Sequence, residues 1–425
     1  MAAGMSADAP VRVYIEILPN LSTLSASVCL EPPLHGPSVS PGLPRIIPRS
    51  GHVLIAPVSA NQAIKVPLPV PIEPASIAIT TSPSTASAAA PASSTIDIKL
   101  NLARPIDAPA RDPSDLGPLP AASLENVLDI QCHACKLSLL DPGSAITKTV
   151  NLPSEFWYEL MDCWACHQED YSQFQKDHQN GVIPAKESTM LVANTHVLLH
   201  TRNLDMTHLE CEPAETAEPG NWKKVCCSRC HESLGECFYD LVNAGNIFAV
   251  KVFKYRVDFW TAAAQSASAS PPAPMARTLH HFPFMAYFVD QVMEYVSAHA
   301  TFRFVVTALD KTPFLIMWVL NWNLLVATNA GGSPECRRQL GYLWGENGGL
   351  TSTENMFPAI KVLYSSCSSN PGLAATWCAD KQVEQIRYRT DSCLDVLRTL
   401  EAATSTLPPD RRVLNGFSVG YLLRS

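Results

Sequence analysis

Short runs in which apolar and polar residues alternate recur through the first hundred positions, and prolines and glycines separate them. A period of two places alternate side chains on opposite faces, so each run predicts a strand with one buried face. Strands are expected at Val11–Leu18, Ser25–Leu30, His52–Ala56, Ala63–Val70, Ser76–Ile79 and Ile96–Leu102. Many short strands with turn signals between them predict a β-rich N-terminal part of sandwich or barrel type.

The last third of the chain mixes helical and extended patterns, which predicts an α+β part. Four apolar residues lie four positions apart, Phe284, Phe288, Val292 and Val296, so a helix is expected over Phe282–Ala300. Phe302–Leu309 and Phe314–Val319 flank Asp310-Lys311-Thr312 and predict a β-hairpin.

Three further elements are expected near the C-terminus. They are a strand at Ala359–Tyr364, a long helix at Ala379–Ala402 and a closing strand at Val413–Leu423. The core face of that helix is expected to carry Val383, Ile386, Leu394, Leu397 and Leu400.

Composition shifts divide the chain into four segments. Residues 1–127 form the β-rich part, with a flexible Thr/Ser/Ala/Pro insertion at 80–94 and a Pro-rich linker at 103–122. Residues 128–260 contain two CxxC pairs, as zinc-knuckle regions do, with strands expected at Thr189–His200 and Phe248–Phe259. Residues 261–277 are expected to be a second flexible loop, and residues 278–425 the α+β C-terminal part.

The charge balance excludes some classes of partner. The net charge is −8, so no basic surface is available to neutralise phosphates, and direct nucleic-acid binding is not expected. The most apolar run, Phe314–Ala327, is too short to cross a bilayer, so no membrane partner is expected. Met1–Pro10 lacks the basic and apolar regions of a secretory signal, so the 14 cysteines indicate reduced or metal-bound thiols.

Two separated CxxC pairs indicate a metal site. The first pair is Cys132 and Cys135, and the second is Cys227 and Cys230. One turn supplies two thiolates, so two turns complete a tetrahedral zinc site with no position left for water, which predicts one structural Zn²⁺. Cys226 is an alternative to Cys227 through a CxxxC spacing, and two unrelated CxxC pairs are the competing interpretation.

A second block lies between the two pairs. Pro153-Ser154-Glu155 is typical of a helix start, and the helix would run past Trp157 toward Trp164. Cys166-His167 follows, and three hypotheses remain open for it. The pair belongs to a second metal site with Cys163 or His196, or consists of a buried Cys beside a surface His, or presents the Cys to a partner.

Motifs of small-molecule enzymes are absent from the sequence. There is no phosphate-binding glycine loop, no HExxH and no GxSxG. Cys367 follows an expected strand, as many nucleophiles do, but no histidine follows it in the chain to serve as a base. A structural role is therefore favoured for Cys367.

Three sequence blocks resemble the family of HECT-like ubiquitin-conjugating-enzyme (E2)-binding proteins, which are described as ubiquitin-protein ligases. They are Cys132-His133-Ala134-Cys135 with the LPSEFW and WACH motifs, then Cys227-Ser228-Arg229-Cys230 with Leu234-Gly235, and finally the tail from Lys361-Val362 to Asn415-Gly416-Phe417. The resemblance implies a protein of cytoplasm and nucleus, with E2 enzymes and ubiquitin as partners. It also implies a link to the zinc-dependent endonuclease of pre-mRNA 3′-end processing.

Two functions follow from this resemblance. In the first, the chain is an E3-like protein that binds an E2 and promotes ubiquitin transfer to substrates. A covalent mechanism would need a thioester cysteine, and Cys367, Cys378 and Cys393 lie in the C-terminal part without a recognisable HECT environment. In the alternative, the chain is a non-enzymatic partner, inhibitor or chaperone of the endonuclease. Cys166 would then reach the partner's metal, on a helix positioned by Pro153, Trp157 and Trp164, and His167 beside it would also contact the partner.

Overall fold

In the computed structural model, the chain forms both β-strands and α-helices and is rich in strands. It describes residues 11–30, 45–56, 63–83, 94–106, 117–152, 182–183, 185–213, 222–240, 246–262, 276–330 and 356–424. The chain forms two compact units: residues up to 110 together with residues from 292 onward, and residues 111–291. The described ranges hold three α-helices among many strands, which agrees with the predicted α+β class.

The first unit is built on a ten-stranded sheet. Its main path runs in the order β22-β23-β20-β19-β1-β2-β7-β6, and β18 and β21 extend it from β19. The strands are β1 (Val11–Leu18), β2 (Thr23–Leu30), β6 (Ile72–Pro83), β7 (Ser94–Leu102), β18 (Arg303–Ala308), β19 (Pro313–Thr328), β20 (Phe357–Ser366), β21 (Glu384–Tyr388), β22 (Val413–Leu414) and β23 (Phe417–Leu423). The expected hairpin is confirmed, because β18 and β19 pair antiparallel.

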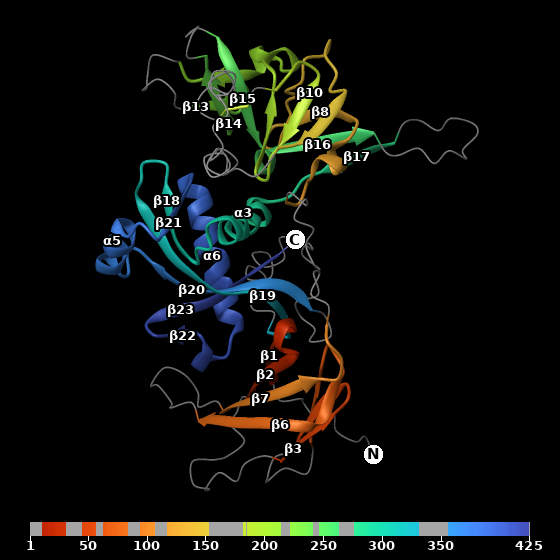
Figure 1. Cartoon of the computed structure of the whole chain (residues 1–425), viewed down its shortest axis with the longest axis vertical. Helices are drawn as coiled ribbons and strands as arrows, with labels where there is room; N and C mark the ends of the chain where they lie inside the picture. The colour runs from red at the N-terminus through yellow and green to blue at the C-terminus, as the bar shows by residue number, and fades with distance from the viewer. Residues whose placement is uncertain are drawn as a thin grey trace, which may run out of the picture. The chain divides into compact units, whose positions relative to one another are not determined.

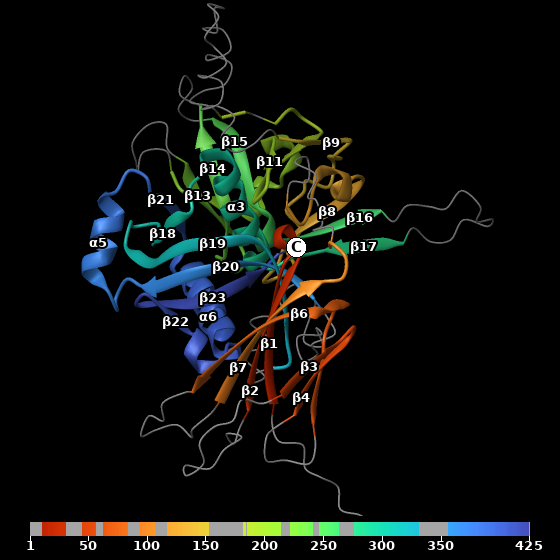
Figure 2. The same ribbon diagram turned by 60° about the horizontal axis from the view of Figure 1, so that its bottom comes forward.

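Strand β19 joins the two ends of the chain. Its final residues pair with β1, where Tyr14 lies opposite Thr328, while its first residues pair with β18 and β20 runs along its other edge. Alternation along β1 then separates two cores. Val13, Ile15 and Ile17 pack with a three-stranded sheet made of β3 (Arg45–Arg49), β4 (His52–Ala56) and β5 (Ile64–Pro67). Figure 2 shows β3 and β4 next to β1 and β2.

Tyr14 belongs to the opposite face, where it shares a core with residues of β23 from the same sheet and with helix α6 (Thr390–Thr406), which packs against β23 (Figure 1). Two ion pairs tie N-terminal strands to C-terminal elements on this face. Lys361 Nζ lies 2.5 Å from Glu16 Oε1, and Arg411 Nη2 lies 2.5 Å from Asp97 Oδ2. Both pairs line a cleft of about 380 Å³. The first unit therefore needs both ends of the chain to complete its fold.

The second unit holds a seven-stranded sheet and a three-stranded sheet, ordered β12-β13-β14-β15-β11-β10-β9 and β17-β16-β8. Its strands are β8 (Val127–Cys132), β9 (Lys148–Asn151), β10 (Thr189–Val192), β11 (His196–Leu199), β12 (Leu209–Cys211), β13 (Lys223–Cys227), β14 (Ser233–Tyr239), β15 (Ile247–Phe253), β16 (Val257–Ala262) and β17 (Arg277–His280). One hydrophobic core is shared by strands of both sheets, including Ile130, Val250 and Phe259, all with no exposed surface.

The helix expected at Phe282–Ala300 is confirmed as α3 (Phe284–His299). Of the helix expected at Ala379–Ala402, only the second half is helical, as part of α6, because α5 (Pro371–Ala379) ends at Ala379 and β21 occupies Glu384–Tyr388. Buried Ile386 and Tyr388 alternate with exposed Gln385 and Arg387, and this period of two is typical of a strand. Pairing of β21 with β18 therefore overrides the helical reading of this stretch.

The core face of α6 also differs from the expected one. Leu394 and Leu397 are only half-buried, and Leu400 is fully buried. The buried face is made by Ser392, Cys393, Val396, Thr399, Leu400, Ala403 and Thr406. Because the helix begins at Thr390, its orientation is set by its packing on β23 and not by the earlier residues.

The expected loops are shorter than the composition indicates. Strand β6 continues to Pro83, four residues into the insertion expected at 80–94. At the other end of the linker expected at 103–122, Leu119 and Ala121 are buried in the core of the second unit. The strands expected at Thr189–His200 and Phe248–Phe259 are each divided in two, as β10 with β11 and as β15 with β16.

No helix in the described ranges is both long enough and apolar enough to cross a bilayer.

We predict that Leu400→Ala destabilises the first unit by about 2–5 kcal/mol, because it leaves a cavity against Gly420 of β23. Leu394→Ala is the matched control on the same helix, and because Leu394 is half-buried its loss should be clearly smaller. Urea unfolding of both variants measures the difference. Equal losses would contradict the orientation of α6.

Gly235 follows the second CxxC pair. At this position β14 approaches β15 so closely that there is no room for a side chain. A Cβ atom at this position would lie 1.9 Å from the backbone oxygen of Lys251 on β15. We expect Gly235→Ala to destabilise the second unit by about 1–3 kcal/mol, since the two strands must separate. Gly372→Ala is the control, because its Cβ would meet nothing within 4 Å. Thermal unfolding that is unchanged in Gly235→Ala would refute this account.

Candidate metal centre

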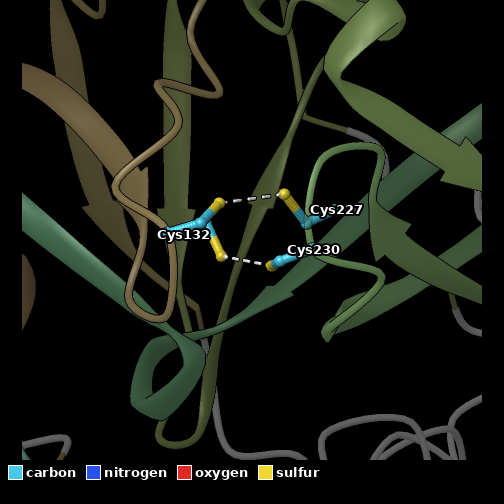
Figure 3. A group of neighbouring side chains, drawn as sticks. Cys132, Cys227 and Cys230 are labelled. Carbon is cyan, nitrogen blue, oxygen red and sulfur yellow. Dashed lines mark hydrogen bonds between the residues drawn. The ribbon is translucent and has the colours of Figure 1, made fainter.

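The structure brings the four predicted cysteines together. Cys132, Cys135, Cys227 and Cys230 each offer a sulfur, and all four sulfurs lie within 4.8 Å of one another. The Sγ atoms of Cys132 and Cys230 are 3.6 Å apart, and those of Cys135 and Cys227 are 3.5 Å apart. Figure 3 shows Cys132 facing Cys227 and Cys230 of the opposite turn.

These separations suit a tetrahedral thiolate site. Four sulfurs at about 2.3 Å from a zinc ion have edges of about 3.8 Å. The two separations of 3.5 and 3.6 Å are slightly shorter than this edge, and no pair exceeds 4.8 Å, so small shifts of the sulfurs would reach that arrangement. Each turn contributes two sulfurs, and the turns belong to segments 92 to 98 residues apart in the sequence. A metal ion here would therefore be held by the protein alone.

The two turns have the same hydrogen-bond pattern. The backbone N–H of Cys132 donates to the Leu137 carbonyl, and that of Cys227 donates to the Glu232 carbonyl, both at 2.9 Å. Four residues after the first cysteine of each turn, a backbone N–H donates back to that cysteine's carbonyl. These residues, Lys136 and His231, have φ values of 59° and 58°. Both turns therefore adopt the left-handed backbone conformation at this position without a glycine.

The first cysteine of each turn is anchored in the core. Cys132 ends β8 and Cys227 ends β13, and both have no exposed surface. Cys135 is half-buried and Cys230 is exposed at the tip of its turn. The strands thus fix one sulfur of each pair, and the turn places the second.

The thiols influence one another's protonation. Burial raises the pKa of Cys132 to about 12, and partial desolvation together with the neighbouring thiol of Cys135 raises the pKa of Cys230. Burial also acts to raise the pKa of Cys135, but the backbone N–H of Leu137 and the neighbouring thiols lower it overall. A divalent cation would stabilise all four as thiolates and release the remaining protons.

A polar network that the sequence analysis missed lies against the first turn. Asp258 of β16 has only 3% of its side chain exposed, and its two oxygens contact His133 Nδ1 at 2.6 Å and Lys136 Nζ at 2.5 Å. His281 Nδ1 lies 3.3 Å from the same carboxylate. Burial acts to raise the pKa of Asp258, but the hydrogen bonds from His133 and Lys136 hold it below its ordinary value. The available sequence signal was an acidic residue within the apolar strand Val257–Trp260.

Two residues left open as metal ligands lie outside the four-cysteine cluster. Cys226 precedes Cys227 on β13, so its side chain points to the other face of the strand. His196 lies on β11, where burial and the charges of Lys251 and Lys254 lower its pKa well below the ordinary value. The remaining predicted site residues, Pro153, Trp157, Cys163, Trp164, Cys166 and His167, lie outside the described residues.

Two of the C-terminal cysteines considered above, Cys367 and Cys393, are poorly suited to nucleophilic chemistry. Cys367 is 6% exposed and Cys393 is fully buried, and burial raises the pKa of each to about 11. Cys393 also donates its S–H to the Thr307 carbonyl at 3.5 Å. Cys378 in α5 is half-buried. The structural role favoured for Cys367 agrees with its place in a small core that includes Trp377.

Several known proteins are similar to this chain. A mouse (Mus musculus) protein named as an E3 ubiquitin-protein ligase is 26% identical over 294 residues, which cover 68% of this chain and 70% of its own. The human (Homo sapiens) protein of that name is 24% identical over 311 residues, covering 68% and 71%. The protein YJR141W of Saccharomyces cerevisiae is 20% identical over 293 residues, covering 69% and 68%. No solved structure matches the chain.

The family model described as HECT-like ubiquitin-conjugating enzyme (E2)-binding matches residues 16–419. The match includes all four clustered cysteines and both ends of the sheet of the first unit. It confirms the resemblance inferred from the CxxC pairs and the C-terminal blocks. The chain therefore belongs to the family of HECT-like ubiquitin-conjugating enzyme (E2)-binding proteins.

Proposed function

We propose that this chain is an E3-like protein that binds a ubiquitin-charged E2 and promotes ubiquitin transfer to substrates, on a scaffold held by one structural Zn²⁺. The observation that carries the proposal is the match to the E2-binding family over residues 16–419. The relatives named as E3 ubiquitin-protein ligases support the transfer step.

The chemistry of the four-cysteine cluster supports zinc as the metal. Soft thiolate ligands in a tetrahedral set favour Zn²⁺ over the oxygen-preferring Mg²⁺ and Ca²⁺. Four sulfurs fill the coordination sphere, so the metal would have no open position for water or substrate. Its role is then to join the turn after β8 to the turn between β13 and β14.

Because the thiols of Cys367 and Cys393 are buried, a transfer in which neither of them forms a thioester with ubiquitin is favoured. A nucleophilic cysteine needs an exposed, low-pKa setting, and Cys367 and Cys393 are instead buried with raised pKa values. The chain would then act by holding the E2 thioester in a reactive geometry, so that the lysine of a substrate attacks it directly.

We expect the purified protein to contain about one zinc per chain and Cys132→Ser to lose it, because three thiolates leave the site open to competing water. Cys226→Ser is the matched control, since Cys226 is adjacent in sequence to a predicted ligand but lies outside the cluster. Elemental analysis and thermal unfolding of each variant are the measurements. The zinc assignment would be refuted if Cys132→Ser kept both the metal and the wild-type melting temperature.

Single-turnover discharge tests the transfer step. The full chain is mixed with a panel of ubiquitin-charged E2 enzymes and free lysine, and the products are separated without reducing agent. We expect at least one E2 to discharge about tenfold faster, with no thiol-sensitive ubiquitin adduct on this chain, because positioning a reactive group commonly yields rate gains of this size or more.

The controls separate the possible mechanisms. Cys378→Ala should retain the full discharge rate, and an adduct lost only in this variant would show a covalent mechanism through Cys378. No acceleration with any E2 would contradict the ligase proposal. That outcome would favour the alternative of a non-enzymatic partner of the 3′-processing endonuclease, with Cys166→Ala as the variant to test for binding.

A further inference from the structure

We infer that Asp258 is the positioning residue of the four-cysteine centre. Its buried carboxylate fixes the first CxxC turn in the geometry that the metal requires. The inference rests on the metal centre proposed above and concerns how tightly that centre retains its ion. It does not depend on whether the chain promotes ubiquitin transfer.

The contacts of Asp258 fall on both sides of the turn. One oxygen contacts His133, the residue directly after Cys132, and the other contacts Lys136, the residue directly after Cys135. A backbone hydrogen bond of 3.0 Å from His133 N to the Arg256 carbonyl adds a third connection to the same segment. The turn therefore cannot rotate on β8 without breaking contacts with a buried charge.

The second turn provides an internal comparison. Its equivalent of Lys136 is His231, whose Nδ1 lies 2.8 Å from Glu210 Oε2 of β12. That pair is open to solvent, with 70% of the His231 side chain and 50% of the Glu210 side chain exposed, whereas Asp258 is 3% exposed. Exposed ion pairs contribute little because water competes for both partners. The two turns thus share a geometry but differ in how firmly an acidic residue holds them.

An alternative role for the same group is a second metal site, because His133, Asp258 and His281 lie within 4.8 Å of one another. The ring geometry argues against it. The two imidazoles stack with centroids 3.8 Å apart and planes 9° from parallel, so their in-plane lone pairs cannot converge on one ion. The ammonium of Lys136 also neutralises the carboxylate. The Asp258 carboxylate is therefore already neutralised by Lys136 and does not need a metal ion as its counter-charge.

Support of this kind is common at metal centres, where removal of a residue that holds a ligand costs about 10–100-fold in metal affinity. Here the support acts through the turn backbone and not through a ligand atom. Loss of Asp258 should leave all four sulfurs in place but let the first pair move. The consequence is faster release of the metal, with the ligand set unchanged.

The test measures transfer of zinc from the full chain to a chromophoric chelator in Asp258→Asn and in the matched variant Glu210→Gln. We expect release at least about tenfold faster in Asp258→Asn and within about twofold of wild type in Glu210→Gln. Asp258→Glu, which keeps the charge, should recover part of the wild-type rate. In the cobalt-substituted protein, Asp258→Asn should alter the visible ligand-field bands while Glu210→Gln leaves them unchanged.

Lys136→Met is a second test variant that is expected to fold normally. The Lys136 side chain is 55% exposed, and its loss removes only one of the two contacts that Asp258 makes with the turn. It should release zinc a few times faster than wild type with an unchanged melting temperature. Wild-type release in both Asp258→Asn and Lys136→Met would overturn the inference. Two metal ions per wild-type chain, one lost in His281→Ala, would also overturn it in favour of a second site. A wild-type protein without metal would instead remove the proposed centre itself.

Discussion

The convergence of the four cysteines Cys132, Cys135, Cys227 and Cys230 is the constraint on which the second unit depends. Its two turns belong to segments 92 to 98 residues apart, so bringing them together closes a long loop of chain. The ordering cost of such a loop must be offset by strong contacts, which the proposed metal–thiolate bonds would supply at one point. Cys132 and Cys227 each end a buried strand, so the centre also fixes where β8 and β13 terminate.

Around the sulfurs, the two turns show how one local geometry is used in two environments. The backbone of the turn is the same in both, including the left-handed residue four positions after the first cysteine. The first turn rests on a buried carboxylate and the second on an exposed one. A metal centre can therefore be symmetric in its ligands and asymmetric in the strength of its support.

The first unit depends on a different constraint, the pairing of the chain's two ends. Strand β1 is held between β2 and the last residues of β19, and its alternate residues supply two separate cores. The same packing buries the thiols of Cys367 and Cys393 and raises their pKa values. Burial that serves the fold in this unit thus leaves these two thiols poorly suited to act as nucleophiles.

The features that the sequence predicted are those that depend on residues close together in the chain. Alternation in Val11–Leu18 and His52–Ala56 predicted strands with the observed bounds, and the four-residue apolar spacing predicted helix α3. The CxxC spacing identified the four cysteines, because a thiolate turn is a short segment whose geometry depends on few residues.

Only the tertiary structure decided the features that depend on distant partners. Residues Glu384–Tyr388 form a strand because β18 offers an edge for pairing, which outweighs the helical spacing around them. Asp258 becomes a support for the first turn because β16 pairs with β8, and its own strand carries no sign of that neighbour beyond a single acidic residue. Local pattern determines the type of an element and the chemistry of its side chains. Which side chains meet is set by packing between segments far apart in the chain.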